Sequence, residues 1–190
     1  MPQRRAARRR GGAAGGAAYG LGPRLEGPDD EEGSTMSDQQ AFQDCYDEDV
    51  AHCYGCGRLN EAGIQLKSYW DGEGTVARFT PRPEHTAIPG FVYGGLLASL
   101  IDCHGTGSAA AAGSRAAGVD PATEPLLRYV TASLQVDYLA PTPMGVELEV
   151  RGVIEQVKGR KVIVEETVSA GDTVVARGRV VAVQMPDSMG

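Results

Sequence analysis

The chain has 190 residues, enough for one ordinary domain with a buried hydrophobic core and, optionally, a tail. Its formal net charge of -7 argues against a general nucleic-acid-binding protein, because phosphate binding needs a basic surface. No apolar run approaches the length of a membrane span, so we expect a soluble protein with neither nucleic acid nor membrane as a partner.

Residues 1–40 are predicted to form a disordered extension that precedes a single domain over residues 41–190. The extension starts with an arginine-rich decapeptide, continues with glycine and alanine, and reaches an acidic run at 29–32. The stretch behind the arginines is too rich in glycine for a secretory signal. The arginine-rich start also fits an organelle transit peptide. We favour the interpretation that the residues before Met36 are translated sequence upstream of a later start at Met36. With no secretion signal, we expect a cytoplasmic protein with reduced thiols.

The segment His52-Cys53-Tyr54-Gly55-Cys56 has the Cys-x-x-Cys spacing of metal ligands, and Cys45 is nearby. The sequence has no second Cys-x-x-Cys or His-x-His pair to complete such a site. We therefore predict a turn here, with no metal and no cofactor.

A hairpin is predicted next, because apolar residues alternate before and after the turn at Asp71-Gly72, until Pro81 stops the second strand. The segment from Gly94 to about Gly113 is apolar nearly all round and predicts a helix. A helix with so little polar surface must be buried.

Four further strands are predicted between turn residues, at 129–139, 146–151, 160–169 and 174–184. In the first of them, strict alternation places Thr131 on one face and Leu134 on the other. Six strands around one buried helix predict an α+β fold, with a six-stranded antiparallel sheet wrapped around one long central helix.

Two segments resemble a known family. Residues 89–102, PGFVYGGLLASLID, are similar to the signature of the PaaI/THEM-like acyl-CoA thioesterases, in which His-Gly-Gly opens a helix and an acid follows nine residues on. Residues 129–141, YVTASLQVDYLAP, resemble the strand of that family that begins with a catalytic-site threonine and ends in Tyr-Leu-x-Pro. The resemblance extends from about Cys53 onward and implies a hotdog fold. It also implies hydrolysis of an acyl-CoA thioester, or of an acyl group on a carrier protein, without a cofactor.

The resemblance assigns catalytic roles to Gly94, Asp102 and Thr131. The backbone N–H of Gly94 would hold the negative charge that develops on the thioester oxygen. Asp102, the only acid in the predicted helix, would act as general base or as nucleophile, and Thr131 would assist it. Substrate-binding roles are predicted for the following residues: Gly95, Tyr93, His85 and Ser99.

The spacing of Gly94 and Asp102 predicts an oligomer. Eight residues of helix separate them by about 12 Å along the axis, too far for both to act on one carbonyl. We therefore expect a homodimer with sites shared between subunits, and leave open whether dimers pair into tetramers.

Two other functions stay open. Tyr93 stands where the family usually has histidine, which would favour a catalytically idle hotdog module that binds acyl thioesters. A histidine together with a helix acid is also similar to hotdog dehydratases, so the second alternative is a dehydratase acting through His85 and Asp102.

Overall fold

The computed structural model describes residues 39–186. The predicted extension, apart from residues 39 and 40, lies outside the described residues, as does Met36. No helix among the described residues is long and apolar enough to cross a membrane.

Six strands form one antiparallel sheet in the order β1-β2-β6-β7-β8-β5. Their bounds are β1 Ser68–Asp71, β2 Gly74–Phe79, β5 Tyr129–Tyr138, β6 Leu148–Lys158, β7 Lys161–Ala170 and β8 Thr173–Gln184. A small second sheet pairs β3 (Thr86–Ile88) with β4 (Phe91–Val92). Three short 3-10 helices lie at η2 Phe42–Cys45, η3 Glu48–Val50 and η4 Pro83–His85.

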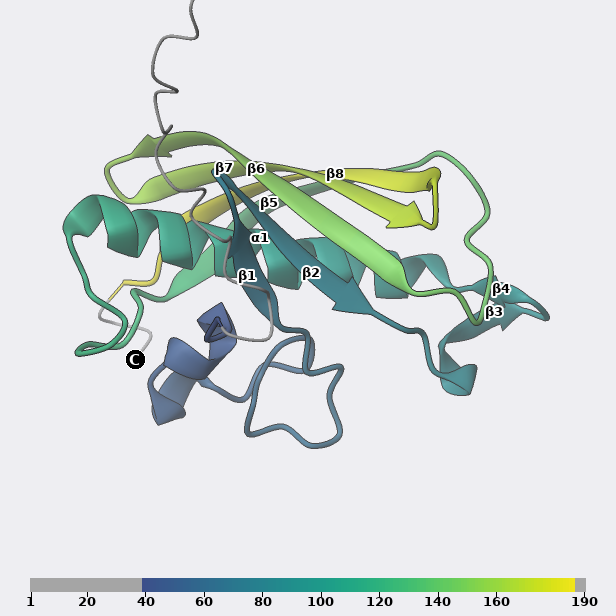
Figure 1. Cartoon of the computed structure of the whole chain (residues 1–190), viewed down its shortest axis with the longest axis horizontal. Helices are drawn as coiled ribbons and strands as arrows, with labels where there is room; N and C mark the ends of the chain where they lie inside the picture. Colours follow the sequence, from purple (N-terminus) through teal and green to yellow (C-terminus); the bar gives the residue numbers. More distant parts are fainter. Residues whose placement is uncertain (1–38, 187–190) are drawn as a thin grey trace, which may run out of the picture. The chain divides into compact units, whose positions relative to one another are not determined.

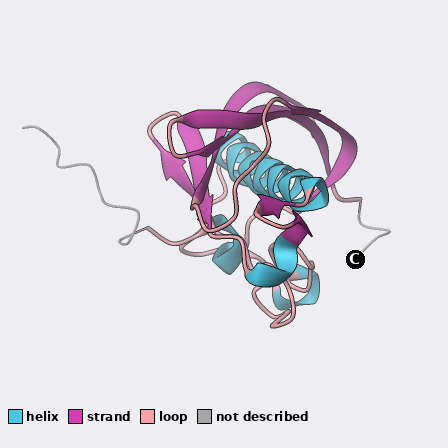
Figure 2. Ribbon diagram, turned by 90° about the vertical axis from the view of Figure 1, so that its right-hand side faces the viewer, coloured by secondary structure: helices cyan, strands magenta, loops and turns pink. Residues whose placement is uncertain are grey.

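Within residues 39–186 there is one long helix, α1 (Gly94–Ala117), and it runs along the concave face of the curved six-stranded sheet (Figures 1 and 2). Most of its side chains are buried, and it ends at Gly118, which adopts a left-handed conformation with φ 76°. This arrangement is the hotdog fold, so the predicted fold class is confirmed. The sequence did not predict the β3–β4 sheet, whose strands are only two or three residues long.

Glycines let the helix approach the sheet closely. A Cβ on Gly178 would lie 2.3 Å from Cγ2 of Ile101, and one on Gly105 would lie 2.5 Å from Cγ2 of Val180. Side chains therefore pass from each layer into space that a glycine leaves on the other.

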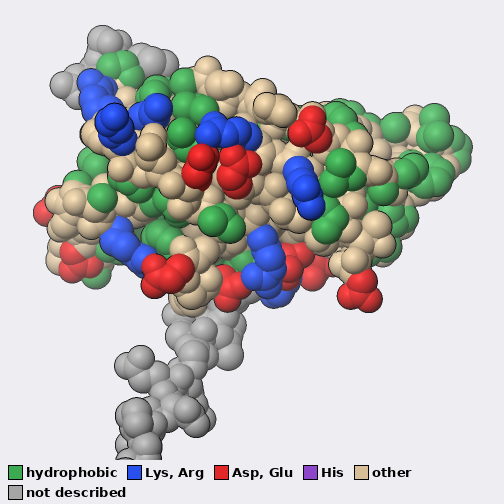
Figure 3. Space-filling model, turned by 90° about the horizontal axis from the view of Figure 1, so that it is seen from above, with side chains coloured by type: hydrophobic (Ala, Val, Ile, Leu, Met, Phe, Trp, Pro, Cys, Tyr) green, Lys and Arg blue, Asp and Glu red, His purple; other side chains and the backbone are tan. Residues whose placement is uncertain are grey.

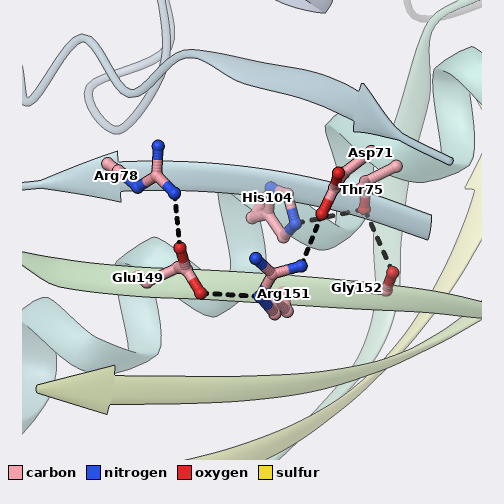
Figure 4. Close-up of polar contacts among 7 residues, drawn as sticks. All are labelled: Asp71, Thr75, Arg78, His104, Glu149, Arg151 and Gly152. Carbon is pink, nitrogen blue, oxygen red and sulfur yellow. Dashed lines mark hydrogen bonds and ion pairs between the residues drawn. The ribbon is translucent and has the colours of Figure 1, made fainter. Parts of the chain in front are cut away.

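The two faces of the sheet differ in polarity near β1, β2 and β6. On the side of α1, the buried His104 ring lies 3.1 Å from the Thr75 hydroxyl (Figure 4). Its other ring nitrogen lies 2.9 Å from the Ser68 hydroxyl, so both ring nitrogens have partners. On the outer side, Arg78, Glu149, Arg151 and Asp71 form a chain of ion pairs (Figure 4). Acidic and basic side chains also lie beside one another in the view from above (Figure 3).

Strict alternation is wrong in β5, because the strand contains a bulge. Thr131 pairs with Ala182 and Leu134 pairs with Val180, so Ala132 adds one extra residue to β5. The bulge places Thr131 and Leu134 on the same face, the one that faces α1. Without it, Thr131 and Leu134 would lie on opposite faces.

Candidate active site

The first turn of α1 presents unused backbone donors. Tyr93 is the N-terminal cap, and the Leu96 N–H donates to the Tyr93 carbonyl at 3.1 Å. Among the described residues, neither the Gly94 N–H nor the Gly95 N–H donates a hydrogen bond. Two orphan donors at a helix N-terminus can receive a negatively charged oxygen.

Tyr138 contacts Gly94 through the Gly94 carbonyl group. Its hydroxyl donates to the Gly94 carbonyl at 2.9 Å, and its ring lies where a side chain on residue 94 would project. A cavity of about 370 Å³ opens beside Gly94. It is lined by Val92, Gly94, Leu97, Tyr138, Leu139, Ala140, Pro141 and Thr142. The Tyr-Leu-x-Pro segment thus forms one wall of a pocket at the helix start, although no separate role was predicted for Tyr138.

Asp102 and Thr131 meet within one chain. The Thr131 hydroxyl donates to Oδ1 of Asp102 and leaves Oδ2 available. Thr131 lies on β5, which is an edge strand of the sheet and is exposed along most of its length. The pair therefore lies beside an open sheet edge.

Burial controls the acidity of Asp102. Its side chain is partly buried, and desolvation raises the pKa of the carboxyl above 3.8. The hydrogen bond from Thr131 and the charge of Arg128 work in the opposite direction, whereas nearby Cys53 adds to the rise. A carboxylate with a raised pKa is a stronger base than an exposed one.

Glu166 is a second acid near this site, and sequence reasoning missed it. It lies in β7 between Gly152 of β6 and Gly178 of β8, and neither of its carboxyl oxygens has a hydrogen-bond partner within residues 39–186. Its Oε1 lies 3.0 Å from the position of a Cβ on Gly105. Burial, and secondarily the charge of Asp102, raise the pKa of the Glu166 carboxyl well above its usual value, which favours the protonated, neutral form.

The signal that could have found Glu166 is weak. Glu166 follows another glutamate, Glu165, and the residue pattern of the strand fits a solvent-facing acid at position 166 equally well. Only the strand register shows that a glycine of the neighbouring strand lies on each side of it.

His85 and Tyr93 lie together, before the helix. Both line a cavity of about 460 Å³ with Tyr54, Ala62, Arg82, Glu84 and Thr86. His85 is buried, its Nδ1 accepts from the Arg82 N–H at 3.1 Å, and burial lowers its pKa. The Tyr93 ring lies against Gly95, 2.3 Å from the position of a Cβ there.

The remaining predicted substrate-binding residue, Ser99, uses its hydroxyl within the helix. It donates to the Gly95 carbonyl at 2.9 Å. A larger cavity of about 540 Å³ lies near the far end of α1, beside Trp70 and Arg115, and none of the predicted site residues lines it.

The structure thus divides the predicted residues into two groups within one chain. Gly94, Gly95, Tyr93 and His85 lie at the start of α1, and Asp102 with Thr131 lies about two helical turns further on, roughly 12 Å along the axis. The cavity beside Gly94 does not include Asp102.

Comparison with known proteins places this architecture among thioesterases. The family model for the thioesterase superfamily matches residues 89–176. This range contains both motif segments, 89–102 and 129–141, and ends within β8. A thioesterase superfamily protein from Shewanella loihica PV-4 has 56% sequence identity over 76% of this chain and 100% of its own, with a TM-score of 0.59.

Less similar proteins also include thioesterases and share the fold. Acyl-coenzyme A thioesterase THEM4 of Xenopus laevis is 33% identical over 88 residues, which is 46% of this chain. The match spans only 33% of that curated relative. The PaaI protein from the phenylacetic acid degradation operon of E. coli shares the fold, with a TM-score of 0.53 at 16% identity, over 65% of this chain and 81% of its own.

Proposed function

This chain belongs to the thioesterase superfamily, and from that membership we propose that it hydrolyses an acyl-CoA thioester to a free acid and CoA. The observation that carries the proposal is the hydrogen bond from Thr131 to Asp102, which joins the two motif segments in one place. A partly buried carboxylate with one oxygen fixed and the other available suits the activation of water.

The proposed reaction proceeds by attack of water on the thioester carbonyl. Asp102 accepts a proton from the water through its free oxygen, and the new C–O bond gives a tetrahedral intermediate. The Gly94 N–H donates to its oxyanion. The C–S bond then breaks, and the proton passes from Asp102 to the CoA sulfur. Within this proposal, Gly95, Tyr93, His85 and Ser99 shape the space for the acyl group.

We propose that each site combines Gly94 of one subunit with Asp102 and Thr131 of another. The separation of the two groups within one chain supports a shared site. The open edge at β5 supports the same arrangement, because apolar side chains stay exposed along it and just beyond, at Leu134 (39%), Tyr138 (55%) and Leu139 (52%). A second copy that pairs along β5 would cover them.

A mixed-dimer experiment tests the shared site. Gly94→Pro removes the proposed oxyanion donor, and proline is compatible with the first position of a helix, where the preceding Tyr93 has φ -73° and ψ 140°. We expect Gly94→Pro and Asp102→Asn dimers each to be inactive. Unfolding and refolding them as an equal mixture should restore about a quarter of the wild-type activity, because each mixed dimer has one intact site. No recovery, with mixed dimers present, would place both groups of a site in one subunit.

The overall reaction is tested with a panel of short, long and aromatic acyl-CoAs, and with acyl-carrier protein as a second donor. We expect release of a free thiol. Formation of an enoyl thioester from a 3-hydroxyacyl substrate, without thiol, would replace hydrolysis with the dehydratase function of His85 and Asp102.

One observation favours a second candidate, a binding module without turnover. Tyr93 replaces the usual histidine of the family, and its ring lies against Gly95 at the helix start. Saturable binding of acyl-CoA with no product of either kind would support that candidate and contradict hydrolysis.

A further inference from the structure

Three cysteine thiols meet at a place that the proposed reaction does not use. Cys53 and Cys56 come from the loop before β1, and Cys103 comes from α1. Their three sulfur atoms lie within 4.8 Å of one another, and those of Cys53 and Cys103 are 3.9 Å apart. The fourth thiol, Cys45, lies outside the group and donates to the Ala41 carbonyl.

We propose that Cys53, Cys56 and Cys103 form a binding site for a thiophilic divalent cation, with Zn²⁺ as the ion that fits best. Tetrahedral Zn²⁺ binds thiolate sulfur at about 2.3 Å, which sets the distance between two bound sulfurs at about 3.8 Å. The pair at 3.9 Å already matches this distance. The most distant pair, at no more than 4.8 Å, would need to close by about 1 Å at most.

A hydrogen-bonded turn holds Cys53 and Cys56 so that their sulfur atoms lie close together. The Gly57 N–H donates to the Cys53 carbonyl at 2.7 Å, which closes the turn that contains both cysteines. A Cβ on Gly55 would lie 2.1 Å from the Cys103 sulfur, so glycine is what allows the turn to meet the helix.

A largely buried cationic side chain, Arg128, is close enough to the three thiols to interact with them electrostatically. The Arg128 guanidinium stacks on the Tyr46 ring at 4.6 Å, and its buried Nη1 atom has no hydrogen-bond partner. No ion pair between Arg128 and a carboxylate occurs within residues 39–186, and the three cysteines are among its electrostatic neighbours. One dication with three thiolates carries a net charge of -1, which Arg128 would balance.

The site has three protein ligands and an open fourth position. No other histidine, cysteine, aspartate or glutamate of the described chain joins the group, so water would complete a tetrahedron. Because Cys103 adjoins Asp102, a bound ion would tie the loop at 53–57 to the helix next to the proposed catalytic acid. Buried thiols also pack as small apolar side chains, and metal binding distinguishes the two roles.

Metal titration of the full chain, free of any affinity tag and kept reduced, tests the proposal without an activity assay. After removal of metal with a chelator, Zn²⁺ is titrated in competition with a chromophoric chelator, and Co²⁺ is added separately to detect thiolate-to-cobalt charge-transfer absorption. We expect one tight equivalent per chain and the charge-transfer band. Cys53→Ser and Cys103→Ser should weaken Zn²⁺ binding at least about 100-fold, whereas Cys45→Ser should bind as the wild type does.

Cys53 is only partly buried, so Cys53→Ser provides a test even if Cys103→Ser fails to fold; circular dichroism checks both variants. Lack of tight binding in the reduced wild type would overturn the proposal. So would equal Zn²⁺ affinity in folded Cys53→Ser, or recovery of these cysteines as a stable disulfide that reductant does not convert to a metal-binding form. None of these results bears on thioester hydrolysis, which is measured separately.

Discussion

Replacing Glu166 with glutamine should change how the stability of the protein depends on pH. The carboxyl group is 3% exposed, has no hydrogen-bond partner among the described residues, and lies near the charge of Asp102. Burial therefore raises its pKa in the folded state well above 4.5, the ordinary value that it regains on unfolding. Between these two pKa values, the unfolded chain releases a proton that the folded chain keeps.

The sign of the effect follows from this proton release. Well below pH 4.5 both states hold the proton, and Glu166 makes no pH-dependent contribution to stability. As the pH rises above that value, the free energy of unfolding falls by about 1.4 kcal/mol per unit, until the folded-state pKa is reached. Glutamine stays neutral at every pH, so Glu166→Gln should be progressively more stable than the wild type as the pH rises.

Urea unfolding at a series of pH values, at one protein concentration and ionic strength, measures this difference. Any constant cost of burying the amide cancels when the difference at high pH is compared with the difference near pH 4.5. Glu165→Gln is the matched control, because Glu165 is exposed and pairs with Arg179 at 2.7 Å. Its stability should shift by less than about 1 kcal/mol. Parallel curves for wild type and Glu166→Gln would refute the assignment of a neutral, buried carboxyl group.

Three further predictions concern the helix and its acid. Gly94→Pro, which lacks the N–H, should lower kcat by about 100- to 1000-fold in thiol-release assays, whereas Gly94→Ala keeps the N–H and should lose far less; equal losses would contradict the oxyanion role. Gly105→Ala should lower the free energy of unfolding by about 1 to 3 kcal/mol, because the added Cβ would lie 2.5 Å from Val180 and 3.0 Å from Glu166. An unchanged urea midpoint would show that α1 can move away from the sheet without a cost in stability. Burial raises the pKa of Asp102, so the acid limb of the pH profile of kcat/KM should lie above pH 3.8. Thr131→Val should move this limb to higher pH, because it removes a hydrogen bond that lowers the pKa of Asp102. A shift of the limb to lower pH would contradict the proposed effect of the Thr131 hydrogen bond.

The sequence predicts the architecture well where apolar patterns are long. The helix beginning at Gly94 and the strands after it are recognisable because each has a long apolar pattern bounded by turn residues, and the structure confirms all of them. Alternation in β5 misleads because a single bulge at Ala132 reverses the faces on either side of it, and no local residue preference marks that position.

Contacts between distant segments are the part that the sequence did not predict. The Cys-x-x-Cys segment was predicted to be a turn because no second pair of ligands follows it in the sequence. The thiol that meets it, Cys103, lies in a helix, where a cysteine fits packing equally well, so the cluster of three sulfurs could not be predicted. Tyr138 and Glu166 were missed for the same reason. Their roles depend on which residues of α1 and of neighbouring strands they face, and that is decided by register and close packing.

The central claim is that this protein hydrolyses thioesters with Asp102 as the acid that activates water. Its most direct test is the rate of thiol release from the best acyl-CoA substrate, compared between the wild type, Asp102→Asn and the control Asp172→Asn in the exposed turn between β7 and β8. We predict that Asp102→Asn lowers kcat by about 100- to 10,000-fold while the fold and oligomeric state persist, and that Asp172→Asn has wild-type activity. Equal rates in wild type and Asp102→Asn, with both proteins folded, would contradict the proposed mechanism.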